Sequence, residues 1–416
     1  MHFHFEDLWS VSTTLSDPLG GVLENGKISI KGKGLSMFRD SSLRLTASLT
    51  KDEKKAQGIF FTPKDARDAV FAILAKHKVS PRSILEPSCG SGEFLEDAYE
   101  RYPTATITGV ELNPQLAASI QRPNIHTMDF LAYSGKHDLI LGNPPYVVIP
   151  KSVETAKCQT NRPNLFVQFL YKAIHENLTS NGVLAFVLPT SLFNCAYYEP
   201  MRRYLLENTT ILSAEILGGD YLDTDQKTFA LVLRKKKGTG SYLVRIQDNV
   251  YLTPYYRKLR VLLKGTSTLA NLGYEVKTGE VVWNQVKDKL ADEGTLLVYS
   301  GNFSKGVLEF GSLKSGKKQY IQGFGRVPLS GKTILINRGY GNTAYTLNAV
   351  IADYPEYYAE NHVNVIRPLT PEAAARIDAV YASLRDRRTA LFIQYFVGNG
   401  ALSKSEIETC LPIWID

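Results

Sequence analysis

Short apolar runs alternate with longer amphipathic stretches from Gly58 to Lys235, and this alternation limits the fold more than any other feature of the 416-residue chain. The pattern is typical of a sheet whose strands are joined by crossover helices, so we predict an α/β domain here. Thr62 and Pro63 should supply the N-cap and first turn of one helix, and another helix is expected over residues 164–178. Seven strands are expected, at Ser83–Glu86, Ile107–Glu111, Ile125–Met128, Leu139–Gly142, Val183–Leu188, Ile211–Leu217 and Thr228–Leu233.

A basic segment that becomes small and flexible, Arg234–Ser241, is the best linker candidate after this domain. Beyond it the periodicity becomes irregular. We therefore divide the chain into an N-terminal extension of residues 1–57, which carries no clear motif, the α/β domain of residues 58–235, and a C-terminal domain of residues 236–416. Two domains also suit a chain of this length.

The two halves of the chain differ in charge. The chain carries 48 basic and 41 acidic residues, and residues 1–235 hold 25 of each, so the whole excess of seven positive charges lies in residues 236–416. Neutralisation of phosphates supplies much of the affinity of proteins for nucleic acid. The excess of basic residues in the C-terminal half therefore fits a catalytic domain joined to a domain that binds a polyanion. Chance clustering of basic residues on a solvated surface explains it equally well.

Composition excludes several classes of protein. Hydrophobic residues make up 44% of the chain and charged residues 21%, which excludes a disordered, collagenous or disulfide-scaffold protein. The apolar runs are far shorter than the roughly 20 residues of a membrane helix, and the N-terminus lacks a secretory signal, so we expect a cytoplasmic protein. The cysteines form no C-x-x-C pair, which predicts free thiols and no structural zinc site; they are Cys89, Cys158, Cys195 and Cys410.

The first candidate site lies in Ile84–Leu95, where an acid and a glycine-rich turn join a predicted strand to a predicted helix. Glycines let the backbone approach a ligand, and a helix N-terminus offers unpaired N–H groups. The turn lacks the full dinucleotide fingerprint, and simple architecture is the alternative. The next two strands lead to Glu111, which could accept from ribose hydroxyls, and to Asp129-Phe130, which could meet an adenine. For either carboxylate taken alone, a solvated strand end is the favoured interpretation.

The most specific motif is Asn143-Pro144-Pro145-Tyr146, which follows the predicted strand Leu139–Gly142. Two consecutive prolines make a rigid, donor-poor segment, at the edge where parallel strands end and ligands bind. The Asn143 amide oxygen and the Pro144 carbonyl can accept both hydrogens of a conjugated amino group, which draws its nitrogen toward nucleophilic character. Tyr146 supplies a ring for stacking. The alternative is an ordinary turn with Tyr146 in the core, which the order of the motifs disfavours.

These motifs, in this order, resemble the gamma class of type II DNA adenine-N6 methyltransferases, in particular the TaqI-like and HincII-like enzymes, from about residue 57 to the C-terminus. The resemblance implies a Rossmann-like S-adenosylmethionine-dependent domain with a mixed, mostly parallel seven-stranded sheet, and a smaller C-terminal α+β target-recognition domain. It implies sequence-specific methyl transfer from S-adenosylmethionine to N6 of an adenine flipped out of double-stranded DNA, and functional pairing with a restriction endonuclease. No metal is expected, since such a transfer needs positioning more than a general base.

The resemblance also assigns a cofactor site. Glu111 would hold the ribose, Leu112 and Phe130 would flank the adenine of the cofactor, Asp129 would accept from its amino group, and Phe169 would be a second aromatic against it. The full predicted set is Thr62, Glu86, Pro87, Gly90, Glu111, Leu112, Asp129, Phe130, Asn143 and Phe169.

The target base would lie elsewhere, clamped by Asn143, Pro144 and Tyr146. The family places a second aromatic against this base, and the spacing here departs from the family pattern by two extra residues. We assign Tyr221 to that role, with Phe229 as the fallback. Because Phe229 lies in an apolar strand, a core role suits it better.

The C-terminal domain resembles the family's recognition domain in three patches, residues 276–285, 298–302 and 336–342, which look like its groove-facing loops. For any one of these side chains taken singly, an ordinary exposed polar residue is the favoured interpretation. Four residues have the chemistry for contacts with bases or phosphates, namely Lys277, Gln285, Arg338 and Asn342.

Two other functions stay open. One is a protein-glutamine or RNA-base N-methyltransferase that uses the same Asn-Pro-Pro-Tyr clamp, although release-factor glutamine methyltransferases typically lack a long basic C-terminal domain. The other is a non-catalytic DNA-binding subunit on a degenerate methyltransferase fold, which the intact motifs disfavour. A phosphate-binding loop at Ser330–Thr333 is not expected, because the residues that follow it are predicted to form a strand.

Overall fold

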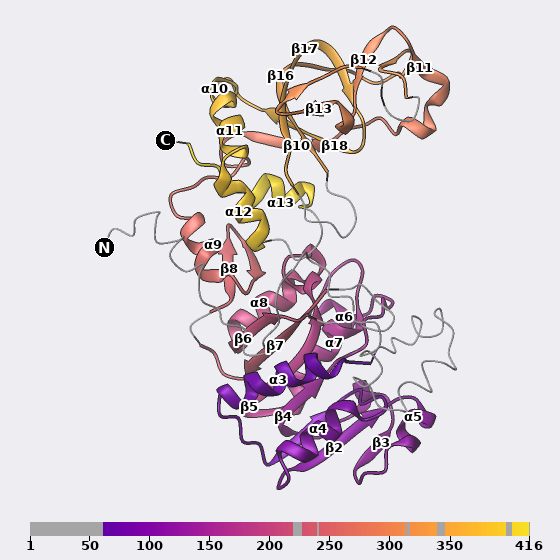
Figure 1. Cartoon of the computed structure of the whole chain (residues 1–416), viewed down its shortest axis with the longest axis vertical. Coiled ribbons are helices and arrows are strands. Elements are labelled where there is room, and N and C mark those ends of the chain that lie inside the picture. The colour runs from indigo at the N-terminus through magenta and orange to yellow at the C-terminus, as the bar shows by residue number, and fades with distance from the viewer. Residues whose placement is uncertain are drawn as a thin grey trace, which may run out of the picture.

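The computed structural model describes residues 61–218, 227–238, 241–311, 313, 317–338, 346–396 and 402–415. Two sheets form the two ends of an elongated molecule, and helices lie between them (Figure 1). The predicted N-terminal extension of residues 1–57 lies outside the described residues, as do Tyr221 and Asn342.

The first sheet has seven strands in the order β3-β2-β1-β4-β5-β7-β6. Strands β1 to β5 pair in parallel, and β7 is antiparallel to both β5 and β6. All seven predicted strands are present, so the predicted mixed, mostly parallel sheet is confirmed. Their bounds are β1 Ser83–Glu86, β2 Thr106–Glu111, β3 Ile125–Thr127, β4 His137–Gly142, β5 Leu178–Pro189, β6 Thr210–Ile216 and β7 Thr228–Arg234.

Helices cover both faces of this sheet, so its central strands are apolar on both sides. In β7, Leu231 and Leu233 pack into the cluster of helices α7 and α8, while Ala230 and Val232 pack into the cluster of α3 and α4. The alternation follows from the two-residue period of a strand. The helices of this domain are α3 Lys64–Lys76, α4 Glu93–Arg101, α5 Pro114–Ser119, α6 Val153–Ala156, α7 Leu165–Lys172 and α8 Glu199–Asn208.

Two predicted helices differ in detail from the observed ones. Helix α3 has Pro63 as its N-cap residue, with no side-chain cap, so the prediction that Thr62 caps it is wrong. The Thr62 carbonyl instead accepts from the Arg67 guanidinium at 2.6 Å. The predicted helix of residues 164–178 is α-helical only to Lys172 and then forms a π-helical turn, Ala173–Asn177.

The second half of the chain is α+β. Its sheet has the order β10-β18-β16-β17-β12-β15-β11 and is antiparallel except for the β12–β17 pair. The strands are β10 Tyr274–Thr278, β11 Leu290–Ala291, β12 Thr295–Val298, β15 Tyr320–Ile321, β16 Leu329–Asn337, β17 Ala349–Ala359 and β18 Val363–Pro368. The helices are α9 Tyr256–Leu262, α10 Pro371–Ala375, α11 Ile377–Leu384, α12 Arg387–Phe396 and α13 Lys404–Thr409.

Strand β16 contains the residues that follow Ser330–Thr333, as predicted, so this segment does not lead into the helix that a phosphate-binding loop requires. All four cysteines are free thiols, as predicted. Within the described part of the chain, no helix combines the length and apolar character that crossing a membrane demands.

A two-stranded hairpin joins the two halves; it consists of β8, Leu243–Ile246, and β9, Asn249–Leu252. One face of the hairpin packs into the core of the first domain, and the other packs into the core of the second. Arg202 of α8, which is 1% exposed, donates to the backbone carbonyls of Val250, Leu192 and Cys195 at this joint. The two sheets are therefore held by a packed joint.

Candidate active site

The carboxyl ends of β1, β2 and β4 meet at one edge of the first sheet, where the loops that follow them line a pocket with the start of α3. Ligands bind at this edge in open α/β sheets. All ten residues of the predicted cofactor set line this one pocket: Thr62, Glu86, Pro87, Gly90, Glu111, Leu112, Asp129, Phe130, Asn143 and Phe169.

The glycine turn shapes the floor of the pocket. Gly90 has φ +54°, a conformation that side-chain-bearing residues rarely adopt, and a Cβ there would meet the Phe61 ring at 3.7 Å. The Gly90 N–H donates to Glu111 Oε2 at 2.8 Å, and the Asn113 N–H donates to Glu111 Oε1 at 2.8 Å. Glu111 is thus fixed by the backbone on both oxygens, and each oxygen keeps a second lone pair for a hydroxyl group.

Glu86 at the end of β1 is a buried carboxylate, only 3% exposed. Burial raises the pKa of Glu86 well above its ordinary value, and the nearby Arg67 opposes that shift. Its Oε2 atom has no hydrogen-bond partner among the described residues. Because an unpaired buried polar atom costs free energy, this oxygen fits a pocket that takes a cationic or N–H-bearing ligand group.

The other end of the pocket is aromatic and apolar. The Phe130 and Phe169 ring centroids lie 4.8 Å apart, and Leu112 is 69% exposed at the rim. Asp129 is exposed, and one of its oxygens accepts from the Leu131 N–H at 2.8 Å. Apolar walls with a carboxylate beside them suit a flat heteroaromatic ring that bears an amino group.

The Asn143-Pro144-Pro145-Tyr146 segment follows β4 and borders the same pocket. Asn143 and Pro145 line the pocket, Pro144 is buried, and neither Pro144 nor Tyr146 is among the lining residues. The Tyr146 hydroxyl lies 2.6 Å from Asn143 Oδ1 and 2.9 Å from the Val187 carbonyl oxygen, and it can donate to either. Asn143 therefore faces the pocket while a tyrosine hydroxyl orients its amide oxygen.

The ring of Tyr146 is half-buried and meets Phe166 edge to face, with centroids 5.8 Å apart. Phe229, the fallback for the second aromatic, is fully buried in β7, and its ring centroid lies 4.5 Å from that of Phe193. The core role that the sequence favoured for Phe229 is confirmed. Tyr221, the first choice for that position, lies outside the described residues.

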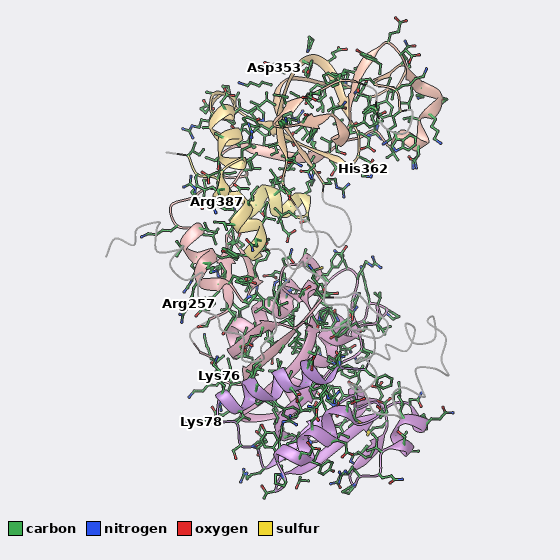
Figure 2. All side chains as sticks on the ribbon, in the orientation of Figure 1. Lys76, Lys78, Arg257, Asp353, His362 and Arg387 are labelled. Carbon is green, nitrogen blue, oxygen red and sulfur yellow. The ribbon has the colours of Figure 1, made fainter. Side chains whose placement is uncertain are left out.

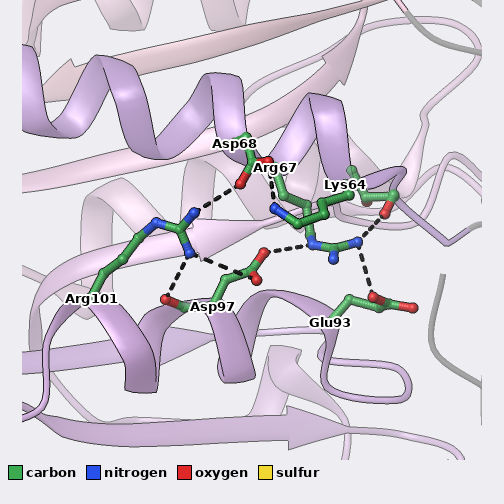
Figure 3. A network of polar contacts seen from close by, with 7 residues as sticks. Lys64, Arg67, Asp68, Glu93, Asp97 and Arg101 are labelled. Atoms are coloured by element: carbon green, nitrogen blue, oxygen red, sulfur yellow. Dashed lines mark hydrogen bonds and ion pairs between the residues drawn. The ribbon is translucent and has the colours of Figure 1, made fainter. Parts of the chain in front are cut away.

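Arg67 was not among the site residues predicted from the sequence. Arg67 is 5% exposed, and its guanidinium pairs with Glu93 and Asp97 of α4 and donates to the Thr62 carbonyl (Figure 3). Thr62 and Glu93 both line the pocket. The available signal was periodicity, because Arg67 lies on the helix face of Ala66 and Val70, and a charged residue on a buried face implies a buried partner.

The described parts of the three predicted recognition patches are far apart in sequence but meet at one turn of the second sheet. This turn is residues 360–363, the link between β17 and β18 together with the first residue of β18. The backbone N–H groups of Gly279 and Arg338 donate to carbonyls of this turn at 2.8 and 3.1 Å. The Glu360 N–H of the turn donates to the Val298 carbonyl at 2.9 Å. The antiparallel register thus gathers the patches, each at the end of a different strand.

The turn also places an imidazole beside a buried carboxylate. His362 Nδ1 lies 2.6 Å from Oε1 of Glu360, whose side chain is 1% exposed. Burial lowers the pKa of His362, and the nearby cations Lys317 and Arg338 lower it further. Figure 2 shows His362 on the side of the second domain that faces the first sheet, and Asp353 on the far side.

Three of the four predicted DNA-contacting residues are described, and all three are exposed: Lys277, Gln285 and Arg338. Lys277 also pairs with Glu275 at 3.3 Å. Close by in sequence to Gln285, the Trp283 ring has the ammonium groups of Lys287 and Lys317 over it, at 5.3 and 4.6 Å from its centroid.

The chain is similar to restriction-modification enzymes. The family model described as Eco57I restriction-modification methylase matches residues 99–220. The type II methyltransferase M.CvrRI of Paramecium bursaria Chlorella virus XZ-6E is 31% identical over 91% of this chain and 100% of its own length. The modification methylase CviBIII of Paramecium bursaria Chlorella virus NC1A is 32% identical over 88% of this chain and 96% of its own. Among solved structures, the M protein of the type I restriction enzyme EcoKI aligns at 20% identity, with a TM-score of 0.36, over 47% of each chain.

The two viral relatives match nearly the whole of this chain, and nearly the whole of each relative is matched in turn. The likeness therefore includes the second sheet as well as the α/β domain with its pocket. The chain belongs to the type II restriction-modification methyltransferases.

Proposed function

We propose that this protein is a sequence-specific DNA methyltransferase that transfers a methyl group from S-adenosylmethionine to N6 of an adenine extruded from double-stranded DNA. The observation that carries the proposal is the place of Asn143. It lines the same pocket as the glycine turn and the three acidic strand ends, and the Tyr146 hydroxyl lies 2.6 Å from its amide oxygen. A nucleophile held by Asn143 would therefore lie next to the bound cofactor.

The pocket fits S-adenosylmethionine by the chemistry of its lining. The buried Glu86 oxygen without a partner suits the ammonium group of the amino-acid end, Glu111 suits the ribose hydroxyls, and Phe130 with Leu112 suits the adenine ring. Asp129 would accept from the amino group of that ring. When bound, the cofactor supplies a methyl group activated by its sulfonium centre.

The chain's own residues would prepare the target nitrogen. Asn143 Oδ1 and the Pro144 carbonyl are the proposed acceptors for the two hydrogens of the target amino group. The Tyr146 hydroxyl fixes the Asn143 amide group in one orientation, which lowers the entropy cost of reaching the reactive geometry. A base inside a duplex cannot reach this pocket, so it must leave the stack at a cost of a few kcal/mol. Stacking on Tyr146, and on Tyr221 as the second aromatic, would offset that cost.

The second domain would bind the DNA. Membership of a restriction-modification family supports DNA as the substrate, and the basic face around the 360–363 turn supports phosphate contacts. Lys277, Gln285, Arg338 and Asn342 are the proposed contacts with phosphates or base edges. A restriction endonuclease that cuts the same sequence would be the functional partner.

Transfer to an RNA base or to a protein glutamine is the competing function, since the same clamp suits any conjugated amino or amide nitrogen. The full-length likeness to type II methyltransferases favours DNA, because it includes the second domain.

The deciding experiment incubates the purified protein with radiolabelled S-adenosylmethionine and, in parallel, with unmethylated genomic DNA, total RNA and a protein extract. We expect label in DNA alone, and mapping of the modified bases should give N6-methyladenine within one short recurring sequence. Label on RNA or protein, or on cytosine in DNA, would contradict the proposal. Protection of the labelled DNA from an endonuclease specific for that sequence would test the functional pairing.

A further inference from the structure

We propose that Arg67 is a positioning residue of the cofactor site: it ties the pocket wall before α3 to the wall formed by α4, and its charge balances the carboxylates that surround it. The inference rests on the proposed binding of S-adenosylmethionine. Arg67 itself is not among the residues that line the pocket, so it would act through its partners.

The Arg67 guanidinium contacts three groups, one before α3 and two on α4. Its Nη1 atom donates to the Thr62 carbonyl at 2.6 Å and lies 2.9 Å from Glu93 Oε2, and its Nε atom donates to Asp97 Oδ2 at 2.7 Å (Figure 3). The side chains of Arg67 and Glu93 are both 6% exposed. Since the guanidinium group is a planar fork, these three contacts fix the relative positions of two pocket walls.

Charge gives Arg67 a second role. Burial is the main cause of the raised pKa of Glu86. Three nearby carboxylates raise that pKa further: Glu111 on β2, and Glu93 and Asp97 on α4. Arg67 on α3 is the cation that lowers the pKa of Glu86. Without the guanidinium, Glu93 and Asp97 would lose this cation, and protonation of Glu86 would be favoured further.

A protonated, neutral Glu86 cannot attract the ammonium group of the cofactor by charge. Because the pKa of Glu86 is raised, cofactor binding should strengthen as the pH rises through that pKa. Loss of the Arg67 charge raises the pKa further, so the same rise in affinity should then occur at higher pH. A purely structural arginine would not move this pH profile.

Arg101 offers a matched control from the same network. It pairs with Asp68 of α3 at 2.8 Å and with Asp97 of α4 at 3.7 Å, so it also joins these two helices. Its side chain is 34% exposed, and neither of these two partners lines the pocket. The Arg101–Asp68 pair lies at the surface, where ion pairs contribute little to stability.

The test titrates S-adenosylmethionine and S-adenosylhomocysteine calorimetrically into the full-length wild type, Arg67→Met, Arg67→Lys and Arg101→Met, between pH 6 and pH 9, with thermal unfolding of each protein alongside. We expect Arg67→Met to weaken binding about tenfold or more at neutral pH, since hydrogen bonds to charged groups are lost. Its affinity should recover toward high pH. Arg67→Lys should restore the pH profile but only part of the affinity, and Arg101→Met should bind like the wild type.

Wild-type affinity and an unshifted pH profile in folded Arg67→Met would overturn the role of Arg67 alone. If Arg67→Met does not fold, Arg67→Lys decides, because it keeps the positive charge but loses the planar guanidinium group. Binding of the cofactor equal to that of the wild type would then overturn the positioning role of the three guanidinium contacts. If Arg101→Met weakens binding as much as Arg67→Met, the effect belongs to the α3–α4 pairing in general and the inference fails. Failure of the wild type to bind either compound would overturn the proposed function itself.

Discussion

The two sheets of this protein gather their candidate functional residues by different rules. In the first sheet, β1, β2 and β4 are parallel, so the residues that follow each strand arrive at the same edge. In the second sheet, most neighbours are antiparallel, so successive strand ends alternate between edges. The first arrangement can be worked out from the order of motifs along the chain, whereas the second depends on the register of pairing.

The two domains also differ in their proposed roles, methyl transfer in the first and DNA recognition in the second. The pocket and Asn143 belong to the first domain, and the 360–363 turn with its basic neighbours belongs to the second. If this division holds, a change in one domain should alter methyl transfer without altering DNA affinity, and a change in the other should do the reverse.

The largest effect is expected from Asn143→Ala. It removes the proposed acceptor for the target amino group, so we expect the rate of methyl transfer to fall by a factor of about 100 to 1000, as for the loss of one preorganised polar group in other active sites. Affinities for S-adenosylmethionine and for unmethylated DNA should remain largely unchanged. Single-turnover transfer and separate calorimetric titrations would measure these quantities. Undiminished transfer would remove Asn143 from the chemistry.

The joint should respond strongly to Arg202→Met. The Val250 and Leu192 carbonyls each lose a buried donor, and the Cys195 carbonyl keeps only the Tyr198 N–H. Each lost hydrogen bond to a charged group corresponds to about 1.5–3 kcal/mol, so unfolding in urea should occur at a clearly lower midpoint. The neighbouring Arg203 is the matched control: it is 38% exposed, and its contacts with Glu199 and with the exposed hairpin-turn carbonyl of Asp248 are not buried in the joint. Arg203→Met should change stability by less than about 1 kcal/mol. Equal effects of the two substitutions would argue against a rigid joint at Arg202.

Most of the first domain was predictable because its physics is local. Strand periodicity located all seven strands, and the rule that parallel strands end at one edge placed Glu86, Glu111 and Asn143 around one pocket. The residues that escaped prediction depend on tertiary contacts. Thr62 was expected to cap α3 with its side chain, but its carbonyl is held by Arg67, a contact that the packing of α4 against α3 creates.

The second domain was less predictable for a different reason. The sequence identified patches that contain Lys277 and Arg338, but only the pairing of β10 and β16 with β18 brings them together. Glu360 and His362 carry no motif, and their pairing arises from a tight turn between two long strands. Sequence order alone could not place this turn next to patches whose nearest described residue, Arg338, is 22 residues away along the chain.

A smaller effect is expected from Tyr146→Phe, which separates the two proposed roles of this side chain. The hydroxyl that lies 2.6 Å from Asn143 Oδ1 is lost, while the ring against Phe166 remains. One hydrogen bond corresponds to about 1 kcal/mol, so transfer should slow about fivefold with little change in affinity for DNA that contains an extrahelical adenine. Tyr146→Ala should reduce both. Equal losses in the two variants would mean that the hydroxyl, and not stacking, accounts for the role of Tyr146.

The smallest effect, and the sharpest test of the division, is expected from Arg338→Gln. Arg338 is exposed beside the 360–363 turn, so loss of one phosphate contact should weaken DNA binding several-fold and reduce the slope of log affinity against log salt concentration by about 1. Transfer at saturating DNA should be unchanged, because the pocket in the first domain is intact.

Arg82→Gln is a suitable control, since Arg82 is 95% exposed on the first domain and pairs only loosely with Asp138, at 3.6 Å. If Arg338→Gln instead changes the preferred DNA sequence while leaving the salt slope intact, Arg338 contacts a base edge. If it leaves affinity, slope and sequence preference all unchanged, the DNA-binding face lies elsewhere, and the contrast between the two sheets loses its functional meaning.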